Sequence, residues 1–388
     1  MSRAPTVVVV GAGAVGGWTA LELTRRGAAV TLLDAWGPGN LRACSSGEQR
    51  IIRATYGPDA FYVPLVARAF ELWRELEVST GTTVYHETGL LWLFSGGDAY
   101  AAEAARHLES YGFSLDELPA AKAHSRFPRL RCDDVESIYF EPRAGLLAAR
   151  AATRILRDEF VRAGGNFRRA RALPPPEDAG SLAALGLADV PQLHADAFVF
   201  ACGPWLRELF PETMGHLIRP SRQEEYYLGP PAEAGFTPPE LPPWLDFADR
   251  MSYAVPSVGG RGLKVADDTR GEPFDPTDGE RKPTYESLRH LRRLLARRLP
   301  DLAEAPVLEA RVCQYENSPD GHPMVDRHPQ LDNTWIAGGG SGHLFKLAPA
   351  LGERVAQMIL EDARTESEFS IGRFDDQTPD GPSSQYET

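Results

Sequence analysis

Hydrophobic and polar positions along this chain follow both strand-like and helix-like patterns. The first pattern is a continuous apolar, β-branched run over residues 6–10, which predicts a strand buried on both faces of a parallel sheet. A helical pattern over residues 14–26 stops at Gly27, and residues 29–33 supply a second strand. The chain therefore opens with a predicted βαβ unit.

The same two patterns recur further along. Helical periodicity predicts helices near residues 61–79, 97–112, 148–164, 283–299 and 346–361. Strand-like runs fall near residues 84–94, 136–140, 196–201, 222–228, 252–256, 306–315 and 334–338. Proline density favours extended surface connections over residues 173–192 and 228–244. We expect the polar, aperiodic tail, residues 363–388, to be loose or draped over the surface.

An arginine-rich stretch, "RKPTYESLRHLRRLLARRLP", raises the question of nucleic-acid binding. Its leucines fall on one face of a helix, with the arginines around them. These leucines are Leu288, Leu291, Leu294, Leu295 and Leu299. The pattern predicts an amphipathic surface helix with a solvated face.

Composition narrows the class of protein. The chain has 388 residues, 43% of them hydrophobic, which is enough for two domains or one domain with a large insertion. A net charge of −13 argues against nucleic acid or an anionic membrane as the main partner. No apolar run approaches the roughly 20 residues of a spanning helix, and the N-terminus lacks a signal-peptide pattern. The four scattered cysteines form no CxxC pair, so we expect a reduced, cytoplasmic protein without a metal site.

A glycine motif opens the predicted βαβ unit. Gly11, Gly13 and Gly16 form G-x-G-x-x-G between strand and helix, where they allow a tight turn, a close approach of pyrophosphate and close packing. Asp34 closes the second strand, where a carboxylate accepts hydrogen bonds from ribose hydroxyls. The motif predicts a dinucleotide site without separating NAD from FAD. The C-terminal helix after "TWIAGGGSGHLFKLAP" favours FAD, because its N-terminus can lie against a flavin ring.

Motifs along nearly the whole chain resemble one family. They are "GAGAVGG", "SSGEQRIIRATYG", "YVPLVARAFELW", "ACGPW", "RQEEYYLG", "GLKVADD", "RVCQYENSPDGHPMVD" and "GGGSGHLFKLAP". In this order they resemble FAD-dependent amine oxidases of the D-amino-acid-oxidase superfamily, in the branch of monomeric sarcosine oxidase and N-methyltryptophan oxidase.

The resemblance implies an α/β fold in two parts. It implies a Rossmann-like FAD-binding domain from residues 1–82, 145–215 and 318–362. A substrate domain with a mixed, largely antiparallel sheet comes from residues 83–144 and 216–317.

The resemblance also implies a covalent flavin. Cys313, between Arg311 and Tyr315, matches the cysteine whose thioether holds the flavin 8α-methyl group. The alternative is a buried cysteine that packs as a small hydrophobe. Further cofactor residues implied by the matched motifs are Ser45, Arg50, Gly203, Gly342 and Lys346. Cys44, Cys132 and Cys202 match no attachment motif and are expected to be structural.

The resemblance also assigns roles around the flavin and the substrate to five side chains. Arg50 lies against the flavin, and Arg53 and Lys346 bind the substrate carboxylate; surface ion pairs are the alternative for these cations. Lys264 activates oxygen, with a solvated lysine on a strand edge as the alternative. Tyr253 matches a tyrosine on the substrate side, with an ordinary core aromatic as the alternative.

Asp268 departs from the sarcosine-specific pattern, which has histidine after "GLK". We expect this aspartate either to pair with a cationic substrate nitrogen or to leave the substrate to hold the proton. The cyclic-imino-acid members that form picolinate also resemble this chain in having an acid here, but they carry tryptophan where His343 stands. A bulkier or cyclic secondary amino acid is therefore at least as well supported as sarcosine.

Together these features predict a flavin-dependent oxidase of a secondary or N-alkylated, or cyclic, amino acid, in which oxygen becomes hydrogen peroxide. The alternatives are a flavin dehydrogenase of the same fold with another electron acceptor and a picolinate-type oxidase of a cyclic imino acid in a biosynthetic pathway. A flavin-binding protein without turnover and a plain NAD dehydrogenase are two further alternatives. The expected partners are the amino acid and O2, and we expect a monomer or weak oligomer.

Overall fold

The computed structural model describes residues 3–231, 235–248 and 250–375, and its strands form three sheets. The first sheet has six strands, in the order β16 (Met324–Arg327), β17 (Thr334–Gly338), β10 (Ala197–Phe200), β1 (Thr6–Val10), β2 (Ala29–Asp34) and β9 (Asn166–Arg169). All its pairs are parallel except β16 with β17. β1 therefore lies inside a parallel sheet, as its valine run predicts.

The second sheet has eight strands and is largely antiparallel, with one parallel pair, β12 with β5. Its order is β15 (Val307–Asn317), β11 (Arg219–Leu228), β14 (Leu263–Asp267), β13 (Met251–Val255), β12 (Trp244–Phe247), β5 (Leu90–Phe94), β7 (Ser137–Glu141) and β6 (Asp116–Glu117). The expected α/β class, with one parallel sheet and one mixed, largely antiparallel sheet, is confirmed.

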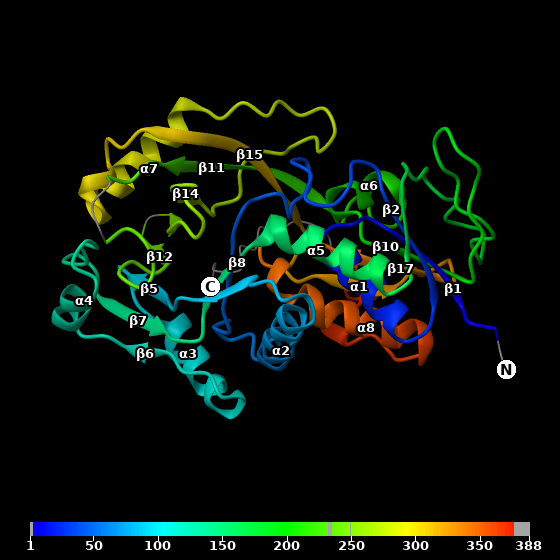
Figure 1. Cartoon of the computed structure of the whole chain (residues 1–388), viewed down its shortest axis with the longest axis horizontal. Helices are drawn as coiled ribbons and strands as arrows, with labels where there is room; N and C mark the ends of the chain where they lie inside the picture. Colours follow the sequence, from blue (N-terminus) through cyan, green and yellow to red (C-terminus); the bar gives the residue numbers. More distant parts are fainter. Residues whose placement is uncertain (1–2, 232–234, 249, 376–388) are drawn as a thin grey trace.

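A small antiparallel sheet and eight α-helices complete the described residues. The small sheet has the order β3 (Arg50–Ile52), β8 (Gly145–Leu147) and β4 (Tyr85–Glu87). The helices are α1 (Ala14–Arg25), α2 (Tyr62–Thr80), α3 (Ala99–Leu108), α4 (Ala120–Arg126), α5 (Ala149–Arg162), α6 (Leu206–Leu209), α7 (Tyr285–Arg298) and α8 (Ala348–Leu360). In Figure 1 the parallel sheet with α1, α5 and α8 occupies one half, while β5, β7, β12 and α7 occupy the other.

The parallel sheet is buried on both faces. Along β1, Val7 and Val9 belong to the core under the helices, whereas Val8 and Val10 belong to a second core on the opposite face. The proline-rich segment 173–192 forms no helix or extended strand, as expected, but it is more than a surface connection. Its leucines Leu182, Leu185 and Leu187 are buried in that second core, so this segment, together with α6, covers the sheet face opposite α1, α5 and α8.

The arginine-rich helix behaves as its pattern predicts. Leu291, Leu294, Leu295 and Leu299 of the α7 region are buried against the eight-stranded sheet, and Leu288 packs beside them. In the described part of the chain, every helix is too short or too polar to cross a membrane.

Two predicted elements differ in their extent. The single strand expected at 84–94 is divided into β4 and β5, because Gly89 turns the chain with a φ of 73°. The helix expected at 97–112 is α3 followed by a 3₁₀ turn (Glu109–Tyr111), and Gly112 ends it in the left-handed region. The short strands β3, β6, β8, β9, β12, β14 and β16 were absent from the predicted set.

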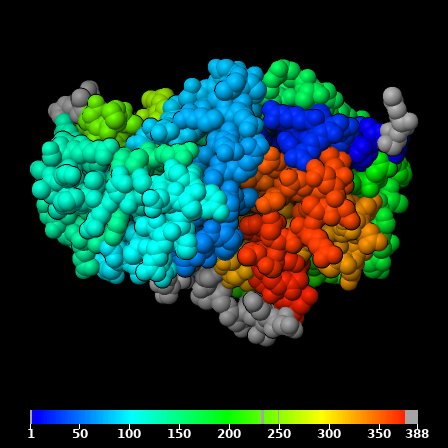
Figure 2. Space-filling view, turned by 90° about the horizontal axis from the view of Figure 1, so that it is seen from below, coloured from blue at the N-terminus to red at the C-terminus, as the bar shows by residue number. Residues whose placement is uncertain are grey.

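The start of the predicted tail packs onto the body of the protein. Residues 363–375 form two short 3₁₀ turns, and the side chains of Phe369, Ile371 and Phe374 are buried. Figure 2 shows this C-terminal segment in red on the surface. Residues 363–375 therefore lie along the surface of the protein, which is one of the two outcomes expected for the tail. The rest of the predicted tail, 376–388, lies outside the described residues. The division into two domains stays a prediction.

Candidate active site

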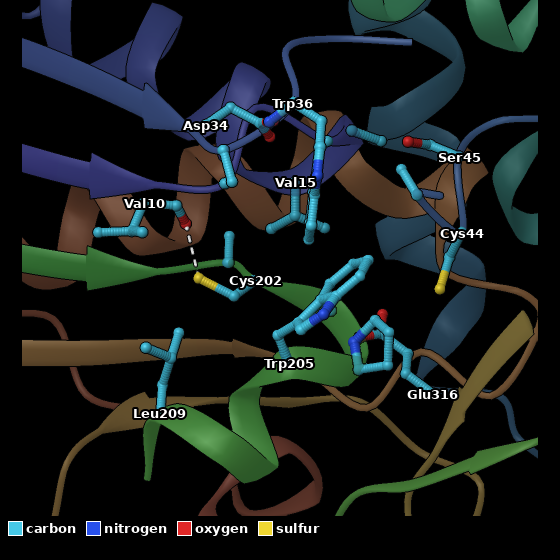
Figure 3. Close-up of a pocket in the computed structure, with 18 of the residues that line it drawn as sticks. Val10, Val15, Asp34, Trp36, Cys44, Ser45, Cys202, Trp205, Leu209 and Glu316 are labelled. Atoms are coloured by element: carbon cyan, nitrogen blue, oxygen red, sulfur yellow. Dashed lines mark hydrogen bonds between the residues drawn. The ribbon is translucent and has the colours of Figure 1, made fainter. Parts of the chain in front are cut away.

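A cavity of about 310 Å³ lies at the carboxyl ends of β1 and β10 (Figure 3). The predicted glycines shape its floor. Gly11 has a φ of 101°, and a Cβ there would lie 2.3 Å from the carbonyl oxygen of Ala201. A Cβ on Gly16 would lie 1.9 Å from the carbonyl oxygen of Gly11. A Cβ on Gly13 would meet only Ser45 Oγ, at 3.7 Å, so glycine here leaves the cavity open at the start of α1.

Asp34 and Ser45 supply polar groups to this cavity. The Asp34 carboxylate accepts hydrogen bonds from the backbone N–H groups of Ala12 at 2.8 Å, Trp36 at 2.8 Å and Gly37 at 2.5 Å. It therefore fixes the turn after β2 as well as facing the cavity. The buried Ser45 hydroxyl has no hydrogen-bond partner within the described residues. A ligand in the cavity would satisfy that hydroxyl.

Aromatic and small residues form the walls. The rings of Trp36 and Trp205 lie 4.7 Å apart between centroids, and Figure 3 shows them with Val15 around the same space. Gly203 lines the cavity in the turn after β10, with a φ of 57°. The Cys202 thiol donates to the carbonyl oxygen of Val10 at 3.3 Å, which fits its expected structural role.

Glu316 faces this cavity from the end of β15. Burial raises the pKa of its carboxyl group to about 7, although the N–H groups of Gly340 and Gly339 donate to it and act in the opposite direction. One of its oxygens, Oε2, finds no partner in the described part of the chain. Glu316 is thus a second buried polar group that a ligand would contact.

A smaller cavity of about 80 Å³ adjoins the first. Arg50, Tyr315, Gly342 and Phe345 line both cavities, so they stand at the junction. A ligand that fills the large cavity can therefore reach the wall of the small one. This places the predicted cofactor residues and the predicted substrate residues on one continuous site.

Strand register brings the polar residues of the small cavity together. Side chains alternate between faces along a strand, and directly paired residues share a face. Gln223 of β11 pairs with Cys313 of β15, and two residues further Glu225 pairs with Arg311. Across the other edge of β11, Tyr227 pairs with Lys264 of β14. One face of the sheet therefore carries this row of polar and charged side chains.

Arg50, from β3 of the small sheet, lies against that row. Its Nη2 donates to the carbonyl oxygen of Cys44 at 2.8 Å and lies 3.7 Å from Cys313 Sγ. Its Nη1 lies 3.9 Å from a carboxylate oxygen of Glu225. Burial acts to lower the pKa of Arg50, but Cys313 and Glu225 outweigh burial and the net shift is upward. The guanidinium thus stays charged beside the buried thiol.

Arg53 and Lys346 converge on one aromatic ring. The Arg53 guanidinium lies 4.5 Å from the Tyr56 ring centroid, and the Lys346 ammonium lies 4.9 Å from it. Both side chains are buried, and Lys346 Nζ donates to the carbonyl oxygen of His343 at 2.9 Å. Burial, and then the Arg53 charge, lower the pKa of Lys346 well below its ordinary value. A bound anion would relieve this repulsion.

Asp268 and Tyr315 form a hydrogen-bonded pair beside these cations. The Tyr315 hydroxyl donates to Asp268 Oδ1. Burial raises the pKa of Asp268 to about 6, while the Tyr315 hydrogen bond and the charges of Arg53 and Lys264 act to lower it. Tyr253 lines the same cavity, and the Lys264 ammonium lies 5.3 Å from its ring centroid.

Lys264 is fully buried and paired. Its ammonium lies 2.6 Å from a Glu225 carboxylate oxygen, and the two side chains are 1% and 4% exposed. A solvated lysine on a strand edge, the alternative considered above, does not fit this burial. The predicted site residues thus lie around the two cavities, and Arg50 and Gly342 belong to both.

Three residues of the site were not singled out from the sequence. They are Tyr56 between the two cations, Glu225 against Lys264 and Glu316 in the larger cavity. Glu225 and Glu316 left a signal, because each is an acid inside a motif that was singled out, "RQEEYYLG" or "RVCQYENSPDGHPMVD". Tyr56 left none, since aromatic residues are common in cores.

Comparison with known proteins agrees with this arrangement. The family described as "FAD dependent oxidoreductase" (DAO) matches residues 6–358. The chain is 29% identical over 378 residues to monomeric sarcosine oxidase of Bacillus sp. (strain B-0618), covering 96% of both chains. It is 28% identical to N-methyl-L-tryptophan oxidase of Salmonella arizonae, covering 95% of this chain and 98% of the relative.

Among solved structures, the fold is similar to L-proline dehydrogenase from P. horikoshii. The TM-score is 0.84 at 21% identity, with 97% of this chain and 99% of the other covered. This likeness concerns the fold. The family match spans both cavities and nearly every element around them, and on this basis the chain belongs to the DAO family of FAD-dependent oxidoreductases.

Proposed function

We propose that this protein is an FAD-dependent oxidase of a secondary or N-alkylated amino acid, which converts a C–N bond to an imine and reduces O2 to H2O2. One observation carries the proposal. Two buried cations, Arg53 and Lys346, and a carboxyl–phenol pair line a small cavity that shares part of its wall with the large cavity. The names of the relatives, which include sarcosine and N-methyl-L-tryptophan oxidases, point to the same substrate class.

The large cavity fits FAD. Gly13 leaves the start of α1 open to a pyrophosphate, and the buried Ser45 hydroxyl, which has no hydrogen-bond partner in the described residues, can bind the cofactor. When bound, FAD supplies the redox chemistry, because it accepts two electrons from the substrate and passes them to oxygen. Arg50 and Gly342, at the junction of the cavities, would hold the part of the cofactor that reaches the substrate.

The proposed substrate is anchored through its carboxylate. A planar guanidinium binds a carboxylate through two parallel hydrogen bonds, and a nearby ammonium adds a third contact. Tyr56 holds Arg53 and Lys346 on its ring, so the clamp is in place before the substrate arrives. These contacts favour amino acids over simple amines.

Asp268 is proposed to act on the substrate nitrogen. An amino acid arrives with a protonated nitrogen, which must lose that proton before the neighbouring carbon is oxidised. With a pKa of about 6, Asp268 is mostly ionised at neutral pH and can accept the proton on its carboxylate. Tyr315 donates to Asp268 and fixes its orientation.

Cys313 is proposed to hold the flavin covalently. Its side chain is buried, lines the small cavity and lies beside the Arg50 guanidinium. This position supports the attachment that the sequence motif implies. The use of O2 as the acceptor, the monomeric or weakly associated state and the cytoplasmic location are proposed on the sequence argument alone.

A panel of substrates tests the proposal. Purified holoenzyme is mixed with N-methyl, cyclic and long-chain secondary amino acids, and peroxide release is measured against the matching primary amino acids. We expect peroxide with at least one secondary amino acid. Reduction of the enzyme without peroxide would favour the dehydrogenase alternative, and no reduction by any of them would reject the proposal.

A further inference from the structure

The lysines of this chain are unevenly placed. Only four of the 41 basic residues are lysines, namely Lys122, Lys264, Lys282 and Lys346. Lys122 and Lys282 are exposed, while the other two are buried in the wall of the small cavity. Elsewhere the chain uses arginine, so lysine at the two buried positions points to a role that needs a compact ammonium.

The two buried lysines differ in their surroundings. Lys346 donates to a carbonyl oxygen and shares the Tyr56 ring with Arg53. Lys264 instead contacts a carboxylate directly, since Glu225 lies 2.6 Å from its ammonium. Within one cavity, the charged neighbour of the Lys346 ammonium is therefore a cation, whereas the charged neighbour of the Lys264 ammonium is an anion.

We infer that Glu225 keeps Lys264 protonated, and so maintains the positive charge that the proposed function requires for the reaction with oxygen. The inference rests on the proposed function, with O2 as the electron acceptor, and on the oxygen-activating role that the family resemblance implies for Lys264. Glu225 is a positioning residue here, because it acts through Lys264.

The other groups that face Lys264 cannot replace Glu225. Arg50 of β3 lies 3.9 Å from the Glu225 carboxylate. Arg311 of β15 places its guanidinium over the Tyr227 ring. β11 and β13 contribute the phenols of Tyr227 and Tyr253. Phenols are neutral at working pH and the arginines are cationic.

On β14 itself, Asp268 follows the strand, and its carboxyl is held by the Tyr315 hydroxyl. Asp267 points to the opposite face, where α7 packs and where His290 lies 3.7 Å from it. Of the anions in the described residues around this ammonium, Glu225 is therefore the one in direct contact.

Glu225 itself is reliably ionised. Burial acts to raise the pKa of its carboxyl group, but Lys264 and then Arg50 lower the pKa to about 2. The Tyr227 hydroxyl also donates to this carboxylate, at 3.2 Å. If Glu225 were neutral, Lys264 would be a buried ammonium close to an arginine, and both burial and repulsion favour loss of its proton.

Lysine NMR tests the inference directly in the oxidised holoenzyme. With ¹³Cε-labelled lysine, the chain gives four signals, and the exposed Lys122 and Lys282 serve as references. Lys264→Met and Lys346→Met assign the other two. In the wild type, the Lys264 ammonium should remain protonated over the whole pH range in which the two exposed reference lysines are protonated. In Glu225→Gln it should lose its proton about two pH units earlier, roughly a 100-fold change, since an opposite charge at this distance shifts such an equilibrium by about 1–3 units.

The pH dependence of flavin reoxidation is the second test of the inference. The rate at which oxygen reoxidises the substrate-reduced enzyme should change little with pH between about 7 and 9 in the wild type. In Glu225→Gln it should fall as pH rises, because Lys264 loses its charge. Glu225→Asp should restore much of the wild-type profile. Glu177→Gln, which changes a buried carboxyl beside His328, is the matched control and should match the wild type.

Two results would overturn the inference. One is a wild-type Lys264 that deprotonates well below the references, and this can be seen without any Glu225 variant. The other is a Lys264 signal that titrates identically in Glu225→Gln. Failure of the proposed function is distinguishable: no secondary amino acid would reduce the enzyme, while the NMR titration of the oxidised protein would still report on the pair.

Discussion

Replacing Lys346 with methionine removes one of the two cations proposed to bind the substrate carboxylate. Lys346 is 4% exposed, and its ammonium bonds to the carbonyl oxygen of His343 at 2.9 Å. Methionine keeps an unbranched apolar stem of similar length beside the Tyr56 ring, and the Trp73 hydrogen bond to the backbone carbonyl of residue 346 does not depend on the side chain. The variant therefore isolates the charge.

The expected loss follows from burial. Stranding one partner of a buried charge pair costs about 2–5 kcal/mol, or roughly 30-fold to several thousand-fold in Kd. We expect the lower part of that range, because Arg53 remains. The loss should also depend on pH. Burial and Arg53 lower the pKa of Lys346, so the free enzyme loses this charge as pH rises, and wild-type affinity should fall about tenfold per pH unit above that pKa.

Binding is measured by titrating the oxidised holoenzyme with a carboxylate analogue that lacks the oxidisable nitrogen, and following the flavin absorbance from pH 6 to 10. Lys282→Met, at a side chain 85% exposed, is the matched control and should bind as the wild type does. The reasoning fails if Lys346→Met binds the analogue as tightly as the wild type, or keeps the same slope with pH.

Three further outcomes are expected. Asp268→Asn should remove the acidic limb near pH 6 from the pH profile of kcat/KM, because the wild-type carboxyl gains activity as it ionises above its pKa of about 6, and it should leave analogue binding nearly unchanged. Acid precipitation should leave wild-type protein yellow, whereas Cys313→Ala should release its flavin to the supernatant; full release from the wild type would reject covalent attachment. Gly16→Ala should lower the free energy of unfolding by about 1–3 kcal/mol, because its Cβ would lie 1.9 Å from the Gly11 oxygen, while Gly17→Ala, with its nearest contact at 3.5 Å, should not.

The sequence predicts the parts of the site that depend on short-range pattern. The valine run of β1 and the glycines after it are contiguous, so their periodicity and spacing determine both the strand and the turn. The leucine stripe of α7 is local in the same way. These predictions required no knowledge of how distant segments meet.

Long-range contacts account for what was missed. Glu225 and Lys264 are 39 residues apart in sequence, and they meet because β11 and β14 pair in one particular register. A shift by one residue would turn Glu225 to the opposite face of the sheet. The role of Tyr56 could not be predicted for a similar reason. Its ring is contacted by Arg53 and Lys346, which are far apart in the sequence.

One measurement bears most directly on the proposed oxidation of an amino acid held by its carboxylate. Holoenzyme is mixed without oxygen with the best secondary amino acid and, separately, with its methyl ester, and the bleaching of the flavin is followed. We expect rapid bleaching by the acid, and bleaching by the ester slowed at least about 100-fold at equal concentration, because the ester cannot pair with Arg53 and Lys346. Equal rates with acid and ester, or no bleaching by either, would contradict the proposed site.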